Sequence, residues 1–493
     1  MTVPVSRIVT ALEDAGVTVR GVVPEDADVE DVMVSGVQQD SRAIRDGDLF
    51  VAWSGAAADA HDHLGAAAAA GAPAAIVERP VPGAEIPLVR VDNARLAAAV
   101  AAGFVAGSPS MKLRTAGVTG TNGKTTTALL LRHLMGRESP AAAIGTLGVV
   151  GPDGGIRGDT GLTTPGPVRM TELLSELVGL GLANVVVETS SHALDQFRLH
   201  GVRFDVMAFT NLTRDHLDYH GTLDRYFAAK ARLLDLGKDG ATAVINADDP
   251  AWAKLRPRGP VLTYGTGRGA EVRALGLRLS ARGSRFELAA QGGRAAVSLP
   301  LPGGFNVYNA LCAGACALAM GQPLEAVAAG LGDAPPVPGR LERIVRGPFD
   351  VLVDFAHTPD ALDKVSGTLK PLIDGKLIVV FGAGGDRDAT KRPEMGAAVA
   401  RHANIAVVTS DNPRTEDPES IVAQVAAGVS GCESVRIVDR LQAIHWALDR
   451  AAPGDAVLLA GKGHESYQVV GTEKLPFDER RIVENHLGLG GDE

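Results

Sequence analysis

The sequence predicts an α/β protein built from three domains, and three observations lead to this prediction. Short, nearly uninterrupted apolar runs, such as NVVVE at 184–188 and AVLLAG at 456–461, are typical of parallel strands covered by helices on both faces. A chain of 493 residues has room for about three domains of roughly 150 residues each. A linker-like segment, AGSPSMK at 106–112, and a proline-rich segment, GDAPPVPGR at 332–340, separate blocks that each repeat the α/β pattern.

The three blocks differ in character, and we place the domains at residues 1–105, 106–335 and 336–493. The first block alternates Ala-rich helices with short strands, which predicts a small α/β domain. The central block opens with a strand, a glycine-rich loop and a helix, which predicts a P-loop ATPase-type parallel sheet. Its end, from about 258 to 302, alternates more and predicts an antiparallel side sheet. The last block repeats strands and helices and predicts a Rossmann-like domain.

Composition narrows the classes of partner and compartment. The formal net charge is −10, so no basic surface favours nucleic acid or an anionic membrane. No stretch reaches the roughly 18 apolar residues that span a bilayer, so we do not expect an integral membrane protein. The first residues lack a basic segment followed by an apolar run, so we expect no signal peptide. Three cysteines cannot form a disulfide framework, which favours a reducing compartment. We therefore expect a cytoplasmic monomer that acts on small molecules.

The segment GVTGTNGKTTT at 117–127 predicts a phosphate-binding loop, because it follows a strand and precedes a helix. Successive backbone N–H groups of such a loop wrap phosphate oxygens, and the helix N-terminus adds a favourable dipole. Lys124 can neutralise the outer phosphates and Thr125 can reach Mg²⁺, although Val118 replaces the first glycine of the general pattern. The residues expected to bind ATP are Gly120, Thr121, Asn122, Gly123, Lys124, Thr125 and Thr126.

A phosphate-binding loop alone fits kinases, motors and switches equally well, so the motifs downstream must separate these classes. GTNGKTT at 120–126 is followed in order by TTP, ETSSHAL, NLTRDHLDYHG, FNVYNA, PGRLE and DFAHTPDAL. Over essentially the whole chain, these motifs resemble those of the Mur ligases, which build the peptide stem of bacterial cell-wall precursors. GDRDATKRPEM, DNPR at 411–414 and GKGHESYQ resemble the branch of this family that adds diaminopimelate.

The resemblance implies a reaction and a set of residues around ATP. A substrate carboxylate would attack the γ-phosphoryl group, and an amine would then displace phosphate from the acyl phosphate. The implied Mg²⁺ ligands are Thr125, Glu188, His216 and Lys230, the last as a carbamate formed with CO₂. The implied catalytic groups are Lys124, Lys230, His216 and Arg340, and further ATP contacts are Asn306, Asn309, Asp354 and His357. Without the resemblance, Lys230 would be assigned to a solvated helix face.

The resemblance also implies a site for a UDP-linked sugar–peptide, with the first domain binding the UDP part. Its implied contacts are Ser41, Thr163, Thr164, Ser190, Gln196 and Arg198. Near Ser41 the family pattern Asp-Gly-His-Asp-Phe reads DAHDH at 59–63 here. Ala60 and His63 depart from the pattern, so the shape of this loop is expected to differ from that of the family.

The second implied substrate is diaminopimelate, which carries an amine and a carboxylate at each end. Its far end needs a cation that binds a carboxylate through two hydrogen bonds, and an acceptor for an ammonium group. Arg414 and Glu465 supply these two chemistries, and lysine-adding relatives lack the Asn-Pro-Arg sequence. The full set of implied contacts is Arg387, Asp411, Asn412, Pro413, Arg414, Gly461 and Glu465.

Several alternatives remain at the level of the sequence. The nearest is the same ligase class adding L-lysine, or a folylpolyglutamate synthetase, which shares the fold. A non-catalytic ATP-binding subunit is disfavoured because Glu188, His216 and Lys230 are all present. A motor or kinase does not explain a last block that carries DNPR. FGAGGDRD could suggest a dinucleotide-binding turn, but its third glycine position holds Arg387.

Overall fold

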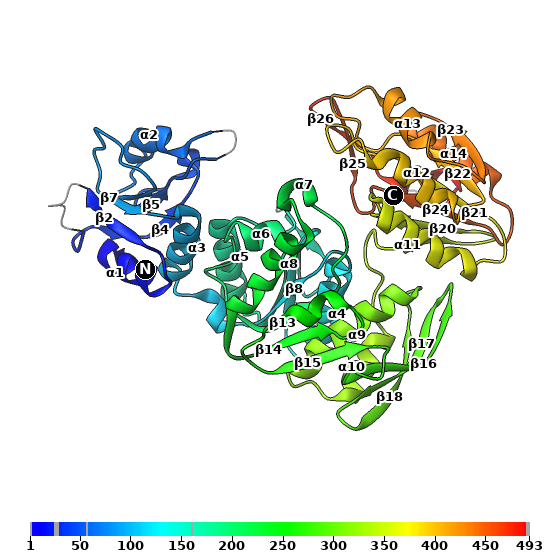
Figure 1. Cartoon of the computed structure of the whole chain (residues 1–493), viewed down its shortest axis with the longest axis horizontal. Coiled ribbons are helices and arrows are strands. Elements are labelled where there is room, and N and C mark those ends of the chain that lie inside the picture. Colours follow the sequence, from blue (N-terminus) through cyan, green and yellow to red (C-terminus); the bar gives the residue numbers. More distant parts are fainter. Residues whose placement is uncertain (1, 24–28, 56–57, 159–160, 490–493) are drawn as a thin grey trace. The chain divides into compact units, whose positions relative to one another are not determined.

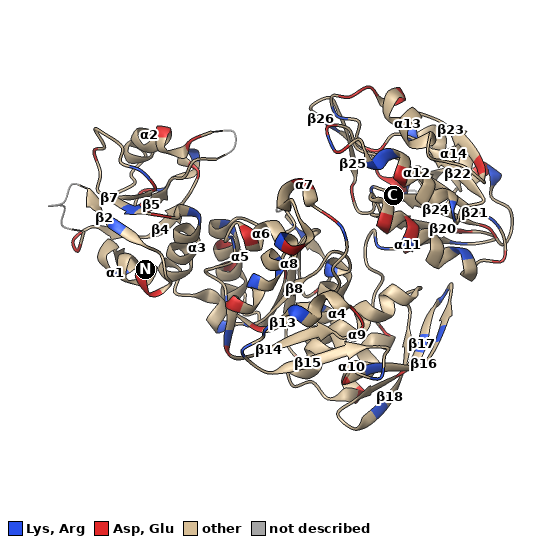
Figure 2. Ribbon diagram, viewed as in Figure 1, with Lys and Arg blue, Asp and Glu red and all other residues tan. Residues whose placement is uncertain are grey.

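The computed structural model describes residues 2–23, 29–55, 58–158 and 161–489 (Figure 1). The chain divides into two compact units. The first comprises Met1–Arg273, Ala289–Arg294 and Asn309–Gly330, and the second comprises Ala274–Leu288, Ala295–Tyr308 and Leu331–Glu493. Within the described ranges, no helix is long and apolar enough to cross a bilayer. Basic and acidic residues are interspersed along the ribbon (Figure 2).

The first unit begins with a five-stranded sheet in the order β2-β7-β6-β5-β4. Its strands are β2 (Val19–Val23), β4 (Gly36–Gln38), β5 (Asp48–Val51), β6 (Ala75–Val77) and β7 (Leu88–Val91). β4 to β7 are parallel and β2 is antiparallel to β7. Two short strands, β1 (Val3–Pro4) and β3 (Met33–Val34), pair beside it. The short strands expected in this block are therefore confirmed.

Helices cover this sheet because their apolar residues recur every three or four positions. In α1 (Val5–Asp14) the buried residues are Val5, Ile8 and Leu12. This helix shares one apolar core with α3 (Ala94–Val105), whose Ala-rich face allows close packing. A second core includes Leu64 and Ala67 of α2 (Leu64–Ala69), one of the Ala-rich helices expected in this block.

The central sheet has the strand order β11-β10-β9-β12-β8-β13-β14-β15-β16-β17-β18. The strands are β8 (Arg114–Thr119), β9 (Ala141–Gly145), β10 (Gly148–Val150), β11 (Ile156–Arg157), β12 (Asn184–Glu188), β13 (Phe204–Phe209), β14 (Gly237–Asn246), β15 (Val261–Gly265), β16 (Val272–Ser280), β17 (Gly283–Ala290) and β18 (Gly293–Leu299). β9, β12, β8, β13, β14 and β15 run parallel. Their carboxyl ends therefore share one edge, where ligands bind in open α/β sheets.

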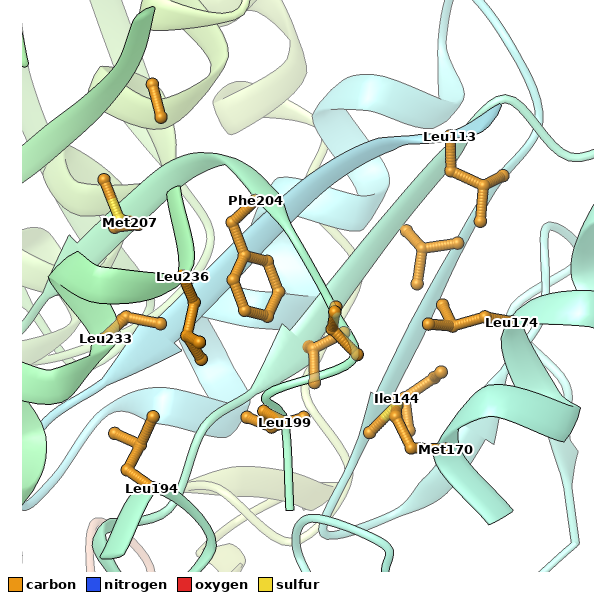
Figure 3. Close-up of a cluster of buried hydrophobic side chains, with 14 of the residues drawn as sticks. Leu113, Ile144, Met170, Leu174, Leu194, Leu199, Phe204, Met207, Leu233 and Leu236 are labelled. Atoms are coloured by element: carbon orange, nitrogen blue, oxygen red, sulfur yellow. The ribbon is translucent and has the colours of Figure 1, made fainter. Parts of the chain in front are cut away.

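The middle strands are buried on both faces, which explains their continuous apolar sequences. All five residues of β12 are buried. The helices of this region are α4 (Lys124–Gly136), α5 (Pro167–Gly179), α6 (Ser191–Asp195), α7 (Leu217–His220), α8 (Leu223–Ala231), α9 (Gly304–Ala319) and α10 (Leu324–Gly332). Figure 3 shows one core cluster, in which Leu174 of α5 and Leu194 of α6 join Phe204 of β13.

The second unit contains a six-stranded sheet in the order β19-β20-β24-β21-β22-β23. Its strands are β19 (Glu342–Arg346), β20 (Asp350–Asp354), β21 (Leu377–Phe381), β22 (Ile405–Val408), β23 (Glu433–Arg436) and β24 (Ala456–Ala460). All are parallel except β19. A separate antiparallel hairpin pairs β25 (Tyr467–Val470) with β26 (Glu473–Pro476).

Helices lie on both faces of this sheet, as the Rossmann-like prediction requires. One apolar core contains residues of α11 (Pro359–Leu369), α12 (Lys391–Ala400) and α13 (Pro418–Ala426). The other contains residues of α14 (Arg440–Arg450) and α15 (Glu479–His486). Asp439 and Asp478 fix where α14 and α15 begin, because each carboxylate accepts a backbone N–H of the first turn.

Candidate active site

The predicted phosphate-binding loop connects the end of β8 to the start of α4, as the sequence indicated. Gly120 and Gly123 have φ values of 149° and 85°, in a region that favours glycine. A Cβ on Gly120 would lie 1.8 Å from Thr210 Oγ1, and one on Gly123 would lie 2.2 Å from Asn309 Oδ1. The loop is therefore closely packed by two polar side chains, one of which is the predicted ATP contact Asn309.

Replacing Gly123 by alanine is expected to weaken ATP binding about ten- to hundredfold, because a residue forced into this backbone region costs about 1–3 kcal/mol. Asn309 would also have to move. Titration calorimetry with an ATP analogue measures the affinity. Gly136→Ala is the matched control at the other end of α4, since its Cβ would find its nearest neighbour, Ala141, at 3.8 Å. Equal affinities for the two variants would contradict the assignment of the loop.

Backbone and side-chain hydrogen bonds from the loop after β13 hold the phosphate-binding loop. Thr121 N donates to Asn211 O at 2.7 Å, and Asn122 N donates to Asn211 Oδ1 at 3.0 Å. Thr210 Oγ1 donates to Asn122 O at 2.7 Å. Lys124 Nζ donates to two carbonyls of its own loop, Gly120 O at 3.0 Å and Thr121 O at 2.9 Å. The ammonium group thus lies within the loop that is expected to surround the phosphates.

Glu188 ends β12 beside the phosphate-binding loop, paired with Val118 of β8. Its carboxylate accepts hydrogen bonds from Thr125 Oγ1 at 3.0 Å, from Thr146 N at 3.0 Å and from Thr146 Oγ1 at 3.1 Å. The Thr146 hydroxyl is also 3.1 Å from Thr163 Oγ1. Glu188 and Thr125, two predicted metal ligands, are therefore in direct contact and almost completely buried.

Lys230 of α8 is 1% exposed, so the solvated-face assignment that its helix alone suggested is wrong. The residue is buried because α8 packs against the loop, where Lys230 Nζ donates to Gly120 O at 2.7 Å. Burial lowers the pKa of Lys230 well below its usual range, the nearby Lys124 lowers it further, and Asp215 opposes the shift. Tyr226, with its ring centroid 4.5 Å from Nζ, donates its hydroxyl to Thr121 Oγ1 at 3.2 Å.

His216 precedes α7 in a left-handed backbone conformation, with a φ of 52°. Its Nε2 is 3.4 Å from Asp215 Oδ2, and its ring contacts that of His192 edge-on at a centroid distance of 4.7 Å. Burial lowers the pKa of His216 to about 4, against the opposing effect of Asp215. The imidazole is therefore neutral at pH 7 and keeps a nitrogen lone pair that can bind a cation.

The donor groups near the phosphate-binding loop fit Mg²⁺ held jointly by protein and nucleotide. Among the residues that the structure describes, no three His, Cys, Asp or Glu side chains form a metal-binding cluster. Mg²⁺ does not need such a cluster, since it is commonly bound by one or two carboxylates, phosphate oxygens and water. The Glu188 carboxylate and the Thr125 hydroxyl are oxygen donors in contact with each other at the loop.

Five of the residues predicted to bind the sugar–peptide are joined by hydrogen bonds that start at Glu188. Thr164 Oγ1 donates to Glu188 O at 2.7 Å and is within hydrogen-bonding distance of Ser190 Oγ, at 3.1 Å. Arg198 donates to Thr164 O at 3.0 Å and to Gln196 Oε1 at 2.7 Å. The structure therefore brings Thr163, Thr164, Ser190, Gln196 and Arg198 together. Ser41 begins a 3₁₀ turn after β4 in the N-terminal sheet.

In the second unit, Arg340, Asp354 and His357 lie at or next to the end of β20. Asp354 accepts hydrogen bonds from Leu341 N at 2.6 Å and Ala356 N at 2.8 Å, and burial raises its pKa, with Arg340 opposing. The Arg340 guanidinium lies 4.7 Å from the centroid of the Phe355 ring. His357 Nδ1 is 2.7 Å from Phe355 O. Asn306 donates to Pro302 O at 2.9 Å, which fixes its amide at the start of α9.

The predicted diaminopimelate contacts lie after β21, β22 and β24, whose carboxyl ends meet at one edge. Asn412 Nδ2 donates to Glu465 Oε2 at 3.0 Å. Arg414, with a φ of 53°, donates through Nη1 to Gly385 O at 2.7 Å. A Cβ on Gly461 would lie 2.9 Å from Asp411 Oδ2, so these two residues are also close. Arg387 lies on the loop after β21, and its side chain is exposed.

Sequence reasoning missed four side chains that position these sites: Thr146, Asn211, Tyr226 and Lys462. Thr146 follows the last residue of β9, and a hydroxyl after a buried strand was a signal that could have identified it. Asn211 had a comparable signal after β13. Tyr226 lies one helical turn before Lys230, so its contact with that residue was accessible from the spacing. Lys462 also follows a buried strand, but a lysine at such a position is ordinarily assigned to the solvated surface.

The loop between β8 and α4 defines a mononucleotide-binding protein, and two family models match the chain around it. Residues 118–317 match the Mur ligase middle domain and residues 339–463 match the Mur ligase, glutamate ligase domain. The chain belongs to the Mur ligase family and is an ATP-dependent ligase. This confirms the family resemblance and the three-domain α/β fold class; the domain boundaries and the roles of single residues stay predictions.

Individual relatives and solved structures agree with this family. The chain is 42% identical over 462 residues to a UDP-N-acetylmuramoyl-L-alanyl-D-glutamate--2,6-diaminopimelate ligase of Geobacillus kaustophilus, covering 91% of this chain and 94% of the relative. A protein of the same name from Thermosynechococcus vestitus is 44% identical over 466 residues, covering 92% and 93% of the two chains. A solved structure with this ligase name is 34% identical, with a TM-score of 0.71 and 99% of both chains covered.

Proposed function

We propose that this protein joins meso-2,6-diaminopimelate to UDP-N-acetylmuramoyl-L-alanyl-D-glutamate, coupled to cleavage of ATP to ADP and phosphate, in the cytoplasmic synthesis of peptidoglycan precursors. The observation that carries the proposal is the contact between Asn412 and Glu465 beside Arg414. Arg414 offers a cation for a carboxylate, and Glu465 offers an anion for an ammonium group. This is the pair of charges that the far end of diaminopimelate needs, and relatives over 40% identical carry diaminopimelate in their names.

The proposed reaction has two steps. The substrate carboxylate attacks the γ-phosphorus of ATP, and ADP leaves. The amine of the second substrate then attacks the carbonyl carbon of the acyl phosphate, and the tetrahedral intermediate expels phosphate. Lys124, which lies within the phosphate-binding loop, is assigned to neutralise charge on the transferred group. Positioning of the reactants supplies the remainder of the rate enhancement.

The proposed cofactors are Mg²⁺ and CO₂. Mg²⁺ would neutralise charge on the phosphate oxygens, and its proposed ligands from this chain are Thr125, Glu188, His216 and Lys230, the last as a carbamate. A neutral amine is the form that reacts with CO₂, and the lowered pKa of Lys230 favours that form. The product, a carbamate, is an anionic oxygen donor with one N–H left. That N–H can keep the hydrogen bond to Gly120 O, so the carbamate fits the contacts of the lysine.

Phosphate release tests the proposed function directly. The protein is incubated with ATP, MgCl₂, bicarbonate and the UDP-muramoyl dipeptide, with and without a candidate amino acid. We expect release that requires meso-diaminopimelate and a product whose mass increases by that of one diaminopimelate residue. Comparable turnover with L-lysine would contradict the proposal. The fold is shared with a Mycobacterium tuberculosis folylpolyglutamate synthase at 20% identity and a TM-score of 0.63. A folate substrate is therefore tested as well, beside diaminopimelate and L-lysine.

A further inference from the structure

Lys462 is a buried cation next to the predicted amino-acid site, and it is not among the residues assigned to substrate. It follows β24 by two residues, and its side chain is 0% exposed. Its Nζ donates to Asn412 Oδ1 at 3.0 Å and to Tyr467 O at 2.8 Å. It also lies 3.6 Å from Asp411 Oδ1 and 3.7 Å from Glu465 Oε2. A buried ammonium needs such partners, so its position is closely determined.

The contacts of Lys462 determine which way the amide of Asn412 faces. Asn412 Oδ1 accepts from Lys462 Nζ and from Val469 N, the latter at 2.9 Å. Asn412 Nδ2 donates to the Glu465 carboxylate. In the reversed amide, the NH₂ group would face two donors and the oxygen would face a carboxylate. Since an amide nitrogen carries two hydrogens, the second N–H of Asn412 also has a fixed direction.

We propose that Lys462 is a positioning residue that holds Asn412 so that its amide presents an N–H donor, and not a carbonyl oxygen, to the amino-acid substrate. The inference rests on the proposed function and deepens it. A donor at Asn412 beside Arg414 makes this part of the site a receptor for a carboxylate. The ammonium group of the same substrate end then faces Glu465. Lys462 thereby determines which part of the site binds the carboxylate and which part binds the ammonium group, without contacting the substrate itself.

The hairpin after Lys462 also holds the backbone of the same loop through hydrogen bonds that do not involve the Lys462 side chain. Arg414 N donates to Val469 O at 3.1 Å, and Gly471 N donates to Arg414 O at 2.8 Å. Gln468 Nε2 donates to Asp411 O at 2.7 Å. Because these bonds do not involve the Lys462 side chain, its removal is expected to disturb the amide of Asn412 more than the course of the loop.

The test is a double-mutant cycle with Lys462→Met and Asn412→Ala, read as the KM for diaminopimelate. Each single variant is expected to raise this KM about tenfold or more, the scale of one hydrogen bond to a charged group. The double variant should be no worse than Asn412→Ala alone, because Lys462 acts through Asn412. The KM values for ATP and the UDP-substrate should stay within about twofold. Additive losses in the double variant, or an unchanged KM in Lys462→Met, would overturn the inference.

Two further measurements separate this inference from folding and from the proposed function. Lys474→Met is the matched control, because Lys474 is exposed on β26 of the same hairpin. If Lys462→Met does not fold, the variant Asn412→Asp tests the inference instead. This substitution keeps an oxygen that accepts from Lys462 and Val469 but replaces the N–H donor of the amide with a second oxygen. A diaminopimelate KM raised about tenfold supports the inference, and an unchanged KM overturns it. If the wild-type protein does not use diaminopimelate as a substrate, the proposed function and the inference are both refuted. If the wild-type protein uses it and the variants have an unchanged KM for diaminopimelate, the inference alone is refuted.

Discussion

Replacing Lys230 by alanine is expected to lower kcat by about 10²–10³-fold, the effect of losing one group that stabilises charge in the transition state. Lys230 is buried at the carbonyl of Gly120, 2.7 Å from the loop expected to hold the phosphates. An unmodified ammonium there would add to the charge of Lys124 and repel Mg²⁺, whereas a carbamate would supply anionic oxygen. Phosphate release at saturating substrates measures the loss.

Chemical rescue distinguishes the carbamate from an ammonium at this position. Formate or acetate should restore part of the activity of Lys230→Ala, because a short carboxylate can occupy the space of the carbamate oxygens. Wild-type activity should also fall when CO₂ and bicarbonate are removed. Lys254→Ala, at an exposed lysine of the same unit, is the control and should keep normal kcat. Rescue by methylammonium in place of carboxylates would rule out the carbamate.

The strands that carry the sites could be predicted because burial on both faces leaves a direct trace in the sequence. NVVVE and AVLLAG correspond to β12 and β24, whose residues are buried throughout. The position of Glu188 at the end of β12 followed from that prediction alone. The phosphate-binding loop was equally accessible, since its glycines have the positive φ values for which glycine is suited.

The environment of Lys230 could not be predicted from its own helix. The periodicity of α8 describes which residues lie on one face, but not whether that face contacts solvent or a loop more than 100 residues earlier. Tertiary contact with Gly120 decides the burial of Lys230 and hence its pKa. Thr146 and Glu188 are likewise 42 residues apart in sequence and meet only through the pairing of β9 with β12.

Lys462 was missed for a related reason. Its partner Asn412 lies 50 residues away in the sequence. Asn412 follows β22 and Lys462 follows β24, two parallel strands of the same sheet. Because buried lysines are rare, the sequence alone predicts that a lysine after a buried strand is exposed to solvent. Contacts with Asn412 and with Tyr467 O of the hairpin, which the local sequence does not reveal, accompany its burial.

The second large effect is expected at Arg414, whose geometry is constrained by contacts within the protein. Its left-handed backbone, with a φ of 53°, is held by hydrogen bonds to Val469 and Gly471 of the neighbouring hairpin. Such strain in a non-glycine residue is typical of functional loops. Nη1 is bonded to Gly385 O at 2.7 Å, which orients the planar guanidinium. A planar cation held in this way can bind a carboxylate through two parallel hydrogen bonds.

Arg414→Ala is expected to raise the KM for diaminopimelate about a hundredfold or more, since each hydrogen bond to a charged group contributes roughly 1.5–3 kcal/mol and two are lost. The KM values for ATP and the UDP-substrate should remain near normal. Arg414→Lys should restore little, because an ammonium cannot form the two parallel bonds. Arg401→Ala, at an exposed arginine paired with Asp363, is the control and should change none of the three KM values. Steady-state kinetics with each substrate varied in turn measures all three KM values.

A diaminopimelate KM that is unchanged in Arg414→Ala would contradict the assignment, and so would wild-type protein that uses lysine as well as diaminopimelate. Lysine has no carboxylate at its far end, and its binding would leave the guanidinium of Arg414 without the partner for which the loop orients it.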